Sequence, residues 1–431
     1  MRVKATSLLV TVTGRDRPGI AARVFDALSR PDQGTGALSV IDVEQVRIHG
    51  RLLLTAEVTA EVTAEVDAGE NGAASPVDAV RRVLEQALAR GEGARRGGPE
   101  STRGADDLVV DVTVVDAGRD AHVPASRRHL VTVLAPELDA RILAEVFECI
   151  ASAGGNVDRI VRLSSYPVTS YELAVTCEDP VRLRRDLGNE AAKLSIDVAV
   201  QRDGLHRRAK HLIVLDADST LLRGEVIDML AERAGCAAEV ASVTEAAMAG
   251  RMEFGPALKK RLGYLTGLDA AAVGEVADAL VLAPGARTLV RTLKRLGYVT
   301  AVVSGGFAEV IAPLVSGLGI DLLAANTLEV VDGRLTGRII GELIDRAGKA
   351  AALERFAREA GVPLAQTIAV GDGANDVDML ERAGLGIAFN AKPSVREAAD
   401  TALSVPYLDA ILFLLGISRE EIEAADLDQE G

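Results

Sequence analysis

The stretch Leu212-Ile213-Val214-Leu215-Asp216-Ala217-Asp218-Ser219-Thr220 decides how the second half of the chain is expected to fold. Four consecutive apolar residues predict a buried strand, and two acids follow where that strand ends. Successive residues of an extended chain point to opposite sides, so Asp216 and Asp218 project to one side and can act on one substrate. The alternative is a solvated turn followed by a helix cap, because Asp, Ser and Thr are favoured in both.

Beyond Thr220 the pattern predicts a doubly wound parallel sheet that carries a helical insertion. The residues up to about Ala283 are helical in pattern, and strands then alternate with helices. The dipeptide Asp332-Gly333 is typical of a two-residue β-hairpin turn. The predicted strands lie at 299–303, 328–331, 334–340, 367–370 and 386–388.

Ahead of the opening stretch, the order strand, helix, strand, strand, helix, strand occurs twice. Such a repeat predicts two ferredoxin-like α+β units. The first unit has predicted strands at 7–12, 39–48, 52–62 and 108–115 and helices at 18–29 and 77–89; the second has strands at 129–135, 157–163, 170–176 and 196–201 and helices at 140–152 and 180–193.

These patterns divide the chain into three domains and a tail. A segment rich in Gly, Arg and Glu at about 91–106 is expected to be a mobile loop; a nucleic-acid arm is the alternative, but acidic residues interleave with the arginines. A short basic stretch, 202–210, is expected to be a linker. The predicted domains are 1–116, 128–202 and 210–417, the last with its helical cap at about 222–283, and 418–431 is predicted to be a solvated acidic tail.

Composition limits the class of protein. The formal net charge of −15 argues against a general nucleic-acid binder. The 3 cysteines have no metal-ligand spacing and are expected to be reduced core residues. The apolar stretch near the N-terminus is too short for a signal peptide, and no apolar run approaches the roughly 20 residues that span a bilayer. We therefore expect a soluble cytoplasmic protein with neither a nucleic acid nor a membrane as partner.

Three further polar clusters are associated with the predicted sheet, and open parallel sheets bind ligands at the carboxyl ends of their strands. Ser304-Gly305-Gly306 offers a hydroxyl and backbone N–H groups to phosphate oxygens. The run from Gly371 to Asp376 offers hard oxygen ligands for Mg²⁺. Lys349, at the start of a predicted helix, could neutralise a phosphoryl group. Singly, each also fits a glycine turn, an Asx turn or a solvated lysine.

Carboxylates are the expected proton carriers of this site. No histidine follows His211, so histidine is excluded as nucleophile or base unless the N-terminal units supply one. A carboxylate nucleophile beside a metal fits covalent phosphoryl transfer through an aspartyl-phosphate.

The order of Asp216-x-Asp218-x-Thr220, Ser304, Lys349 and Gly371-Asp372-Gly373-x-Asn375-Asp376 resembles the haloacid dehalogenase superfamily of phosphatases. The inserted segment, with Glu225, Ala247-Met248-x-Gly250-x-Met252-x-Phe254 and Leu258 to Arg261, resembles the phosphoserine phosphatases of that superfamily. The resemblance covers roughly residues 212–405. It implies a Mg²⁺-dependent hydrolase that converts O-phospho-L-serine to L-serine and phosphate, the last step of serine biosynthesis.

The same resemblance implies a role for each matching residue. Asp216 would be the nucleophile, and Asp218 would protonate the departing oxygen and then activate water. Asp216, Asp372 and the main-chain carbonyl of Asp218 would hold Mg²⁺. Glu225 would face the substrate ammonium and Arg261 its carboxylate; singly, they also fit a helix-dipole acid and a surface charge. The implied substrate-binding residues are Glu225, Met248, Phe254, Arg261, Ser304, Gly305, Lys349 and Asn375.

The paired N-terminal units resemble ACT domains, which bind amino acids at domain interfaces. Asp16-Arg17-Pro18-Gly19 resembles their ligand-loop motif, and Gly154-Gly155-Asn156 in the second unit is a looser match. The implied effector residues are Asp16, Gly19 and Asn156, with serine as the expected effector and a homodimer as the expected assembly. A purely structural or dimerising role is the alternative.

Two other functions stay open. One is a broader phosphatase of the same superfamily that acts on other phosphomonoesters or on phosphoproteins. The other is an amino-acid sensor whose phosphatase domain is inactive, against which the intact Asp, Ser, Lys and metal-loop positions argue.

Overall fold

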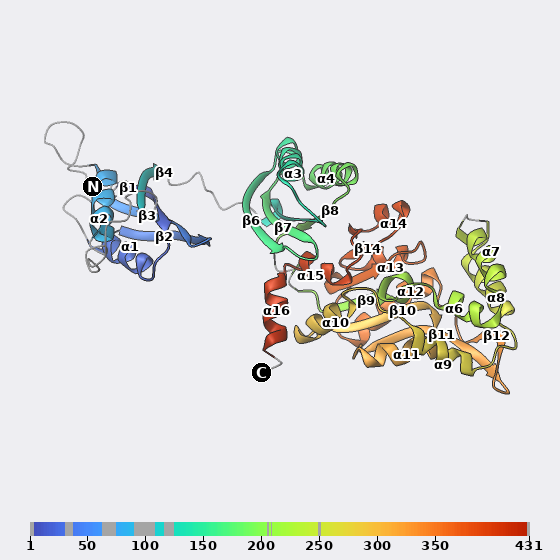
Figure 1. Cartoon of the computed structure of the whole chain (residues 1–431). Coiled ribbons are helices and arrows are strands. Elements are labelled where there is room, and N and C mark those ends of the chain that lie inside the picture. The colour runs from blue at the N-terminus through green and yellow to red at the C-terminus, as the bar shows by residue number, and fades with distance from the viewer. Residues whose placement is uncertain are drawn as a thin grey trace. The chain divides into compact units, whose positions relative to one another are not determined.

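The computed structural model describes residues 4–30, 38–62, 75–89, 108–115, 125–204, 207, 209–248 and 251–428. The chain divides into two compact units, Met1–His122 and Val123–Gly431, and most of their elements are labelled in Figure 1. The predicted mobile loop at 91–106 lies outside the described residues. Within the described ranges, no helix is long and apolar enough to cross a membrane.

The first unit is an antiparallel sheet with two helices packed on one face. Alternate residues of its central strand, Leu8, Val10 and Val12, are fully buried, as expected for a sheet covered on one side. They pack in one core with Val24 of the first helix and Leu84 of the second. The sheet order is β2-β3-β1-β4. Its elements are β1 (Lys4–Arg15), α1 (Ile20–Ser29), β2 (Leu38–Ile48), β3 (Arg51–Val62), α2 (Pro76–Ala89) and β4 (Val109–Val115).

The second unit begins with a domain of the same topology. Its helices start at acidic caps: Asp139 accepts a hydrogen bond from the Ile142 N–H at 2.8 Å, and Asp179 accepts one from the Arg182 N–H at 3.0 Å. The sheet order is β6-β7-β5-β8. Its elements are β5 (Arg128–Ala135), α3 (Ala140–Ser152), β6 (Asn156–Ser164), β7 (Thr169–Thr176), α4 (Pro180–Leu194) and β8 (Asp197–Arg202). The predicted repeat is confirmed.

The rest of the second unit is built on a seven-stranded sheet of order β12-β11-β10-β9-β13-β14-β15. The strand that carries the opening motif lies at its centre, and helices cover both faces. Ile213 and Leu215 pack into one hydrophobic core, whereas Leu212 and Val214 pack into a second. All neighbouring pairs are parallel except β11–β12, the hairpin that the Asp-Gly turn predicts. The strands are β9 (Leu212–Asp216), β10 (Val299–Phe307), β11 (Leu322–Val331), β12 (Arg334–Ile340), β13 (Thr367–Gly371), β14 (Gly386–Phe389) and β15 (Thr401–Leu403).

Helices complete this domain and form its cap. The cap is held to the β11–β12 hairpin by main-chain hydrogen bonds from the Gly267 N–H to the Leu335 carbonyl and from the Ala270 N–H to the Gly333 carbonyl, both 2.8 Å. The cap helices are α6 (Val226–Ala234), α7 (Ala237–Met248), α8 (Phe254–Tyr264) and α9 (Ala271–Ala279). The others are α10 (Ala286–Arg295), α11 (Ala308–Gly317), α12 (Arg346–Glu359), α13 (Val377–Arg382), α14 (Pro393–Ala398) and α15 (Ile411–Leu414).

The predicted acidic tail is helical in its described part, although Glu420, Glu421 and Glu423 are exposed to solvent as predicted. Residues Arg419–Leu427 form helix α16, visible in red at the C-terminal end in Figure 1. Ser418 and Glu421 form a capping box, and Ile422 is buried. Asp426 pairs with Arg291 and, at 2.5 Å, with Arg295 of α10. Glu421 and Asp426 therefore stabilise the helix and its contact with α10.

The predicted basic linker 202–210 contains buried residues where the second α+β domain meets the sheet domain. The Arg207 guanidinium lies 2.6 Å from the Glu172 carboxylate of β7, and its Nε donates to the Leu414 carbonyl at 3.1 Å. Gln201 donates to the same carbonyl at 2.8 Å. Asp197 of β8 accepts a hydrogen bond from the Ser404 N–H at 2.6 Å, just after β15. The two domains of this unit thus share a polar interface.

Candidate active site

The opening stretch turns sharply after β9 and presents its two acids in different environments. Asp216 is the last residue of the strand and is buried. Asp218 lies in the turn, where its Oδ1 accepts from the Val226 N–H at 2.9 Å and its Oδ2 from the Ser304 hydroxyl at 3.3 Å. Ser219 then takes a left-handed conformation with φ of 58°. Both predicted catalytic residues therefore lie at the carboxyl end of the central strand.

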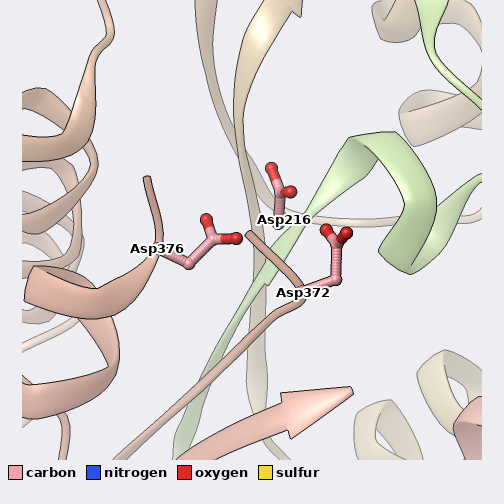
Figure 2. Close-up of side chains that lie close together, drawn as sticks. All are labelled: Asp216, Asp372 and Asp376. Atoms are coloured by element: carbon pink, nitrogen blue, oxygen red, sulfur yellow. The ribbon is translucent and has the colours of Figure 1, made fainter. Parts of the chain in front are cut away.

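Three carboxyl groups from two strand ends converge beside this turn (Figure 2). Asp216 comes from β9, Asp372 follows β13, and Asp376 precedes α13. One oxygen from each lies within 4.8 Å of the others. Gly371 is needed here, because a Cβ at that position would lie 2.4 Å from Cγ of Asp376. The predicted metal ligands Asp216 and Asp372 are thus together, and Asp376 is the third carboxylate of the group.

Lys349 joins two of these acids. Its ammonium donates to Oδ1 of Asp216 and to Oδ1 of Asp376, both at 2.6 Å, and its side chain is 1% exposed. The helix that carries it is capped by Asp345, which accepts from the Gly348 N–H at 2.9 Å. Although burial lowers it, the two carboxylates raise the pKa of Lys349 above its usual value. The lysine is therefore a fixed positive charge inside the cluster.

The pKa values of the acids in this cluster are raised, because the acids are buried and because the cluster carries more negative than positive charge. Burial, and then Asp376, raise the pKa of Asp216 well above its ordinary value. Burial, and then Glu225, raise the pKa of Asp218 to about 7. Burial, and then Asp376, raise the pKa of Asp372 to about 7. Buried acids that repel one another in this way favour a bound cation.

These residues fit a divalent metal ion. The donors are all hard carboxylate oxygens, Asp216 and Asp376 are buried, and Asp372 is half-buried. Mg²⁺ takes such ligands and commonly keeps only one or two protein carboxylates, with water and phosphate completing its octahedron. Thr220 donates to Oδ1 of Asp372 at 3.4 Å and so orients that carboxylate.

Residues Ser304-Gly305-Gly306 of β10, called the Ser304 loop below, lie beside the carboxylates. The Ser304 hydroxyl accepts from the Gly306 N–H at 2.8 Å while it donates to Asp218. Gly305 is half-exposed in an otherwise buried run, as backbone that approaches a ligand must be. Asn375 lies half-buried in the turn between Asp372 and Asp376. One point at the carboxyl ends of the strands is therefore surrounded by Ser304, Lys349 and the acids.

The cap contributes charged residues above this point. Arg261 of α8 is 8% exposed, and its Nη1 donates to the Thr244 hydroxyl at 3.5 Å. Its Nε finds no hydrogen-bond acceptor among the described residues. Burial lowers the pKa of Arg261, against the opposing effect of Glu225 and Asp228. A buried guanidinium with an unused donor suits a ligand carboxylate.

Glu225 faces the same space from the start of α6. Its Oε1 accepts from the Ser219 hydroxyl at 3.3 Å. Burial, and then Asp228, raise the pKa of Glu225. Met248 ends α7 and Phe254 begins α8, but their side chains lie outside what the structure describes, so their implied part in substrate binding stays a prediction.

The chain is closely similar to known enzymes over nearly its whole length. It is 49% identical over 420 residues to a phosphoserine phosphatase of Streptomyces coelicolor, covering 97% of this chain and 94% of that protein. It is 45% identical over 427 residues to phosphoserine phosphatase SerB2 of Mycobacterium tuberculosis, covering 97% and 95%. The chain belongs to the phosphoserine phosphatase family. The family resemblance drawn from the motifs is confirmed.

Domain matches and a solved structure agree with this membership. Residues 213–381 match the haloacid dehalogenase-like hydrolase family, and residues 6–74 and 127–201 each match an ACT domain. The structure of a probable phosphoserine phosphatase from Vibrio cholerae covers 68% of this chain and 88% of its own, with 30% identity and a TM-score of 0.54. The fold of this chain is a haloacid dehalogenase-type sheet with a helical cap, preceded by two ACT domains.

The structure shows the contacts and backbone conformation of the predicted effector residues in the two ACT domains. Asp16 pairs with Arg47 at 3.0 Å, and Gly19, with φ of 88°, precedes α1 in a left-handed conformation that favours glycine. Asn156 donates to Oδ1 of Asp158 at 2.8 Å. It also lines a cavity of about 510 Å³ between α3 and β6, together with Phe147.

Several residues that touch the site escaped the sequence analysis. Thr244 and Asp228 lie around Arg261 on other cap helices, which no local spacing reveals. Asp376 was part of a recognised motif, and the structure adds that one of its oxygens lies within 4.8 Å of oxygens of Asp216 and Asp372. Asn326 was also missed, because its burial and its bond to Gly305 depend on packing between distant segments and no local pattern marks it.

Proposed function

We propose that this chain hydrolyses O-phospho-L-serine to L-serine and phosphate with Mg²⁺ as its metal. The observation that supports this most is the group at the end of β9, where Asp216, Asp218 and Lys349 lie together beneath a cap that presents Arg261 and Glu225. The family membership supports the same substrate.

In the first step, an oxygen of Asp216 attacks phosphorus, and the bond from phosphorus to the serine oxygen breaks. Asp218 gives its proton to that departing oxygen, a role that its pKa of about 7 permits near neutral pH. In the second step, Asp218 takes a proton from water as the water attacks phosphorus, and the bond to Asp216 breaks. The products are phosphate and the regenerated carboxylate.

The surrounding residues hold the transferring group. Lys349 and the Ser304 hydroxyl would bind phosphoryl oxygens, and Gly305 and Asn375 would line the same space. A metal ion held by Asp216 and Asp372, with Asp376 beside them and with the main-chain carbonyl of Asp218 as a further ligand, would supply charge stabilisation to phosphoryl oxygens. Arg261 would pair with the substrate carboxylate and Glu225 with its ammonium.

Phosphate release from O-phospho-L-serine tests this proposal. The purified chain should release phosphate with Mg²⁺ and lose this activity in a chelator, and Asp216→Asn should abolish turnover while the protein stays folded. O-phosphothreonine, a phosphoserine peptide and a simple aryl phosphate serve as competing substrates. Equal specificity constants for all four would favour the broader phosphatase, and no turnover of any would favour the inactive sensor.

We further propose that serine, the product, regulates the enzyme through its ACT domains in a cytoplasmic homodimer that serves serine biosynthesis. The cavity beside Asn156 and the turn at Asp16 and Gly19 support an amino-acid ligand. Serine should change both activity and oligomer mass in a titration that couples phosphate release to light scattering. A titration without response in either measurement would remove the feedback proposal and leave the catalytic one standing.

A further inference from the structure

Asn326 bridges two segments that flank the active site. It lies in β11, opposite Phe307 of β10, and is 1% exposed. Its Nδ2 donates to the Gly305 carbonyl at 2.9 Å, and its Oδ1 accepts from the Ile344 N–H at 2.9 Å. One side chain thus holds the main chain of the loop that carries Ser304 and of the segment that enters α12.

The first of these hydrogen bonds replaces a missing sheet contact. Strands β10 and β11 pair regularly from Ala301 to Val303, lose register, and pair again only at Phe307. The three residues in between are Ser304-Gly305-Gly306, so sheet pairing with β11 does not fix this loop. The Asn326 amide supplies a side-chain bond where the ladder is interrupted.

This bond fixes the orientation of the Ser304 hydroxyl. The Gly305 carbonyl and the Gly306 N–H belong to one rigid peptide plane. The carbonyl is held by Asn326, and the N–H donates to the Ser304 Oγ at 2.8 Å. With one lone pair engaged in this way, the hydroxyl is left to donate, and its acceptor is Asp218 at 3.3 Å.

The second hydrogen bond acts on the other side of the site. Ile344 precedes Asp345, whose side chain caps α12 and whose carbonyl accepts from the Lys349 N–H at 2.8 Å. Lys349 lies in the first turn of that helix and reaches Asp216 and Asp376. The position of Ile344 therefore influences where the lysine ammonium enters the cluster.

We propose that Asn326 is a positioning residue that sets Ser304 and Lys349 at the spacing a transferring phosphoryl group requires. The inference rests on the proposed function, because it names the group that Ser304 and Lys349 receive. An amide is suited to this place, since it presents one donor and one acceptor in a single plane. A carboxylate of the same shape has no donor, and an aliphatic side chain has neither.

Asn326→Asp separates the two bonds. It keeps an acceptor for the Ile344 N–H but turns a second oxygen toward the Gly305 carbonyl. We expect kcat on O-phospho-L-serine to fall between about tenfold and a hundredfold, because misplacement of a binding group by about 1 Å can cost up to about a hundredfold. The dissociation constant of inorganic phosphate, measured by calorimetry with Mg²⁺, should rise in parallel. Protonation of the introduced carboxyl restores a donor, so the ratio of variant to wild-type kcat should recover as the pH is lowered.

Glu309→Ala is the matched control. Glu309 accepts from the Leu328 N–H at 3.1 Å, on the same strand, but it is bonded neither to the Ser304 loop nor to the segment before α12. It should leave kcat within about twofold of the wild-type value, as surface and bracing substitutions away from a site usually do. Asn326→Ser, which adds no charge and is too short to reach both main-chain groups, gives the same test if Asn326→Asp does not fold.

The measurements distinguish this inference from the proposed function. If the wild type hydrolyses phosphoserine and folded Asn326 variants match it in kcat, phosphate affinity and pH profile, the inference is wrong and the function stands. If the wild type binds phosphate without hydrolysing phosphoserine, and the variants bind it more weakly, the function is wrong and the positioning role stands. A wild type that does neither overturns both.

Discussion

At the scale of single residues, the site depends on two acids whose surroundings give them different chemistry. Lys349 contacts the carboxylate of Asp216, whereas Asp218 accepts hydrogen bonds from Val226 and Ser304. The proposed nucleophile is thus beside a fixed cation, and the proposed acid accepts hydrogen bonds from neutral donors. This difference is the physical basis for assigning attack to one and proton transfer to the other.

Asp218→Asn tests the proton-transfer role. In the wild type, the Asp218 carboxyl has a pKa of about 7 and is mainly protonated below pH 7. The rate of the first step should therefore fall as the pH rises above that value. The variant should lower kcat on phosphoserine by about a hundredfold or more. The loss in the first step should be smaller on an aryl phosphate, whose leaving group needs no proton. Burst-phase kinetics on both substrates measure that step, and equal losses would contradict the role.

Lys349→Met tests the charge balance of the cluster. The variant leaves Asp216 and Asp376 buried without their shared cation, which should cost about 3–5 kcal/mol of unfolding free energy without metal. Loss of the lysine removes a charge that lowers the pKa of Asp216, so the folded state holds the Asp216 proton still more tightly than the unfolded state does, and stability should fall as the pH rises above the unfolded pKa of 3.8. Urea unfolding in a chelator at stepped pH measures this.

Exposed Lys259 in the cap provides the control for this variant. Lys259→Met should change the unfolding free energy by less than about 0.5 kcal/mol. Added Mg²⁺ should restore part of the stability that Lys349→Met loses, because a bound cation neutralises the same carboxylates. A Lys349→Met protein as stable as the Lys259→Met protein at every pH would show that the acids are not ionised in the folded state.

At the scale of helices and strands, substrate choice is expected to depend on the cap. Arg261→Ala should lower kcat/KM for phosphoserine roughly tenfold to a hundredfold, because a hydrogen-bonded charge pair with the substrate carboxylate is lost. It should leave kcat/KM for phosphoethanolamine, which has no carboxylate, nearly unchanged. The ratio of the two specificity constants measures this, with Arg251→Ala on the exposed part of the cap as control. Equal losses on both substrates would indicate a structural role for Arg261.

The helices and strands themselves were largely predictable, because each has one strong local pattern. Alternation in β1 and the apolar run of β9 are visible in the sequence, and so are the polar clusters that follow the apolar runs of β9, β10 and β13. Helix α16 was missed although Ser418 and Glu421 form a capping box, since its acidic composition outweighed that signal. Partners such as Thr244 for Arg261, or Asn326 for Gly305, depend on packing between distant segments and carry no sequence spacing.

At the scale of the molecule, the second ACT domain is tied to the phosphatase domain by buried polar groups. Glu172 and Arg207 form an ion pair whose side chains are 10% and 7% exposed, and Leu414 accepts from both Arg207 and Gln201. The segment that follows Ser404 also contacts the chain between the cap and α10, since the Leu408 N–H donates to the Pro284 carbonyl at 2.8 Å. One stretch of chain therefore contacts both the second ACT domain and the segment that joins the cap to α10.

Asp197 makes this interface sensitive to pH. It is 3% exposed, and burial raises its pKa despite the hydrogen bond from Ser404. The folded state therefore holds this proton more tightly than the unfolded state does. Its contribution to stability is complete below the unfolded pKa of 3.8 and is lost as the pH rises through the folded value.

Asp197→Asn keeps an acceptor for the Ser404 N–H but cannot ionise, so its melting temperature should fall less between about pH 4 and pH 7 than that of the wild type. Glu178→Gln, at an exposed position of the same domain, should follow the wild-type curve. Parallel curves for all three proteins would mean that water reaches the Asp197 carboxylate and that the two domains separate readily at this edge.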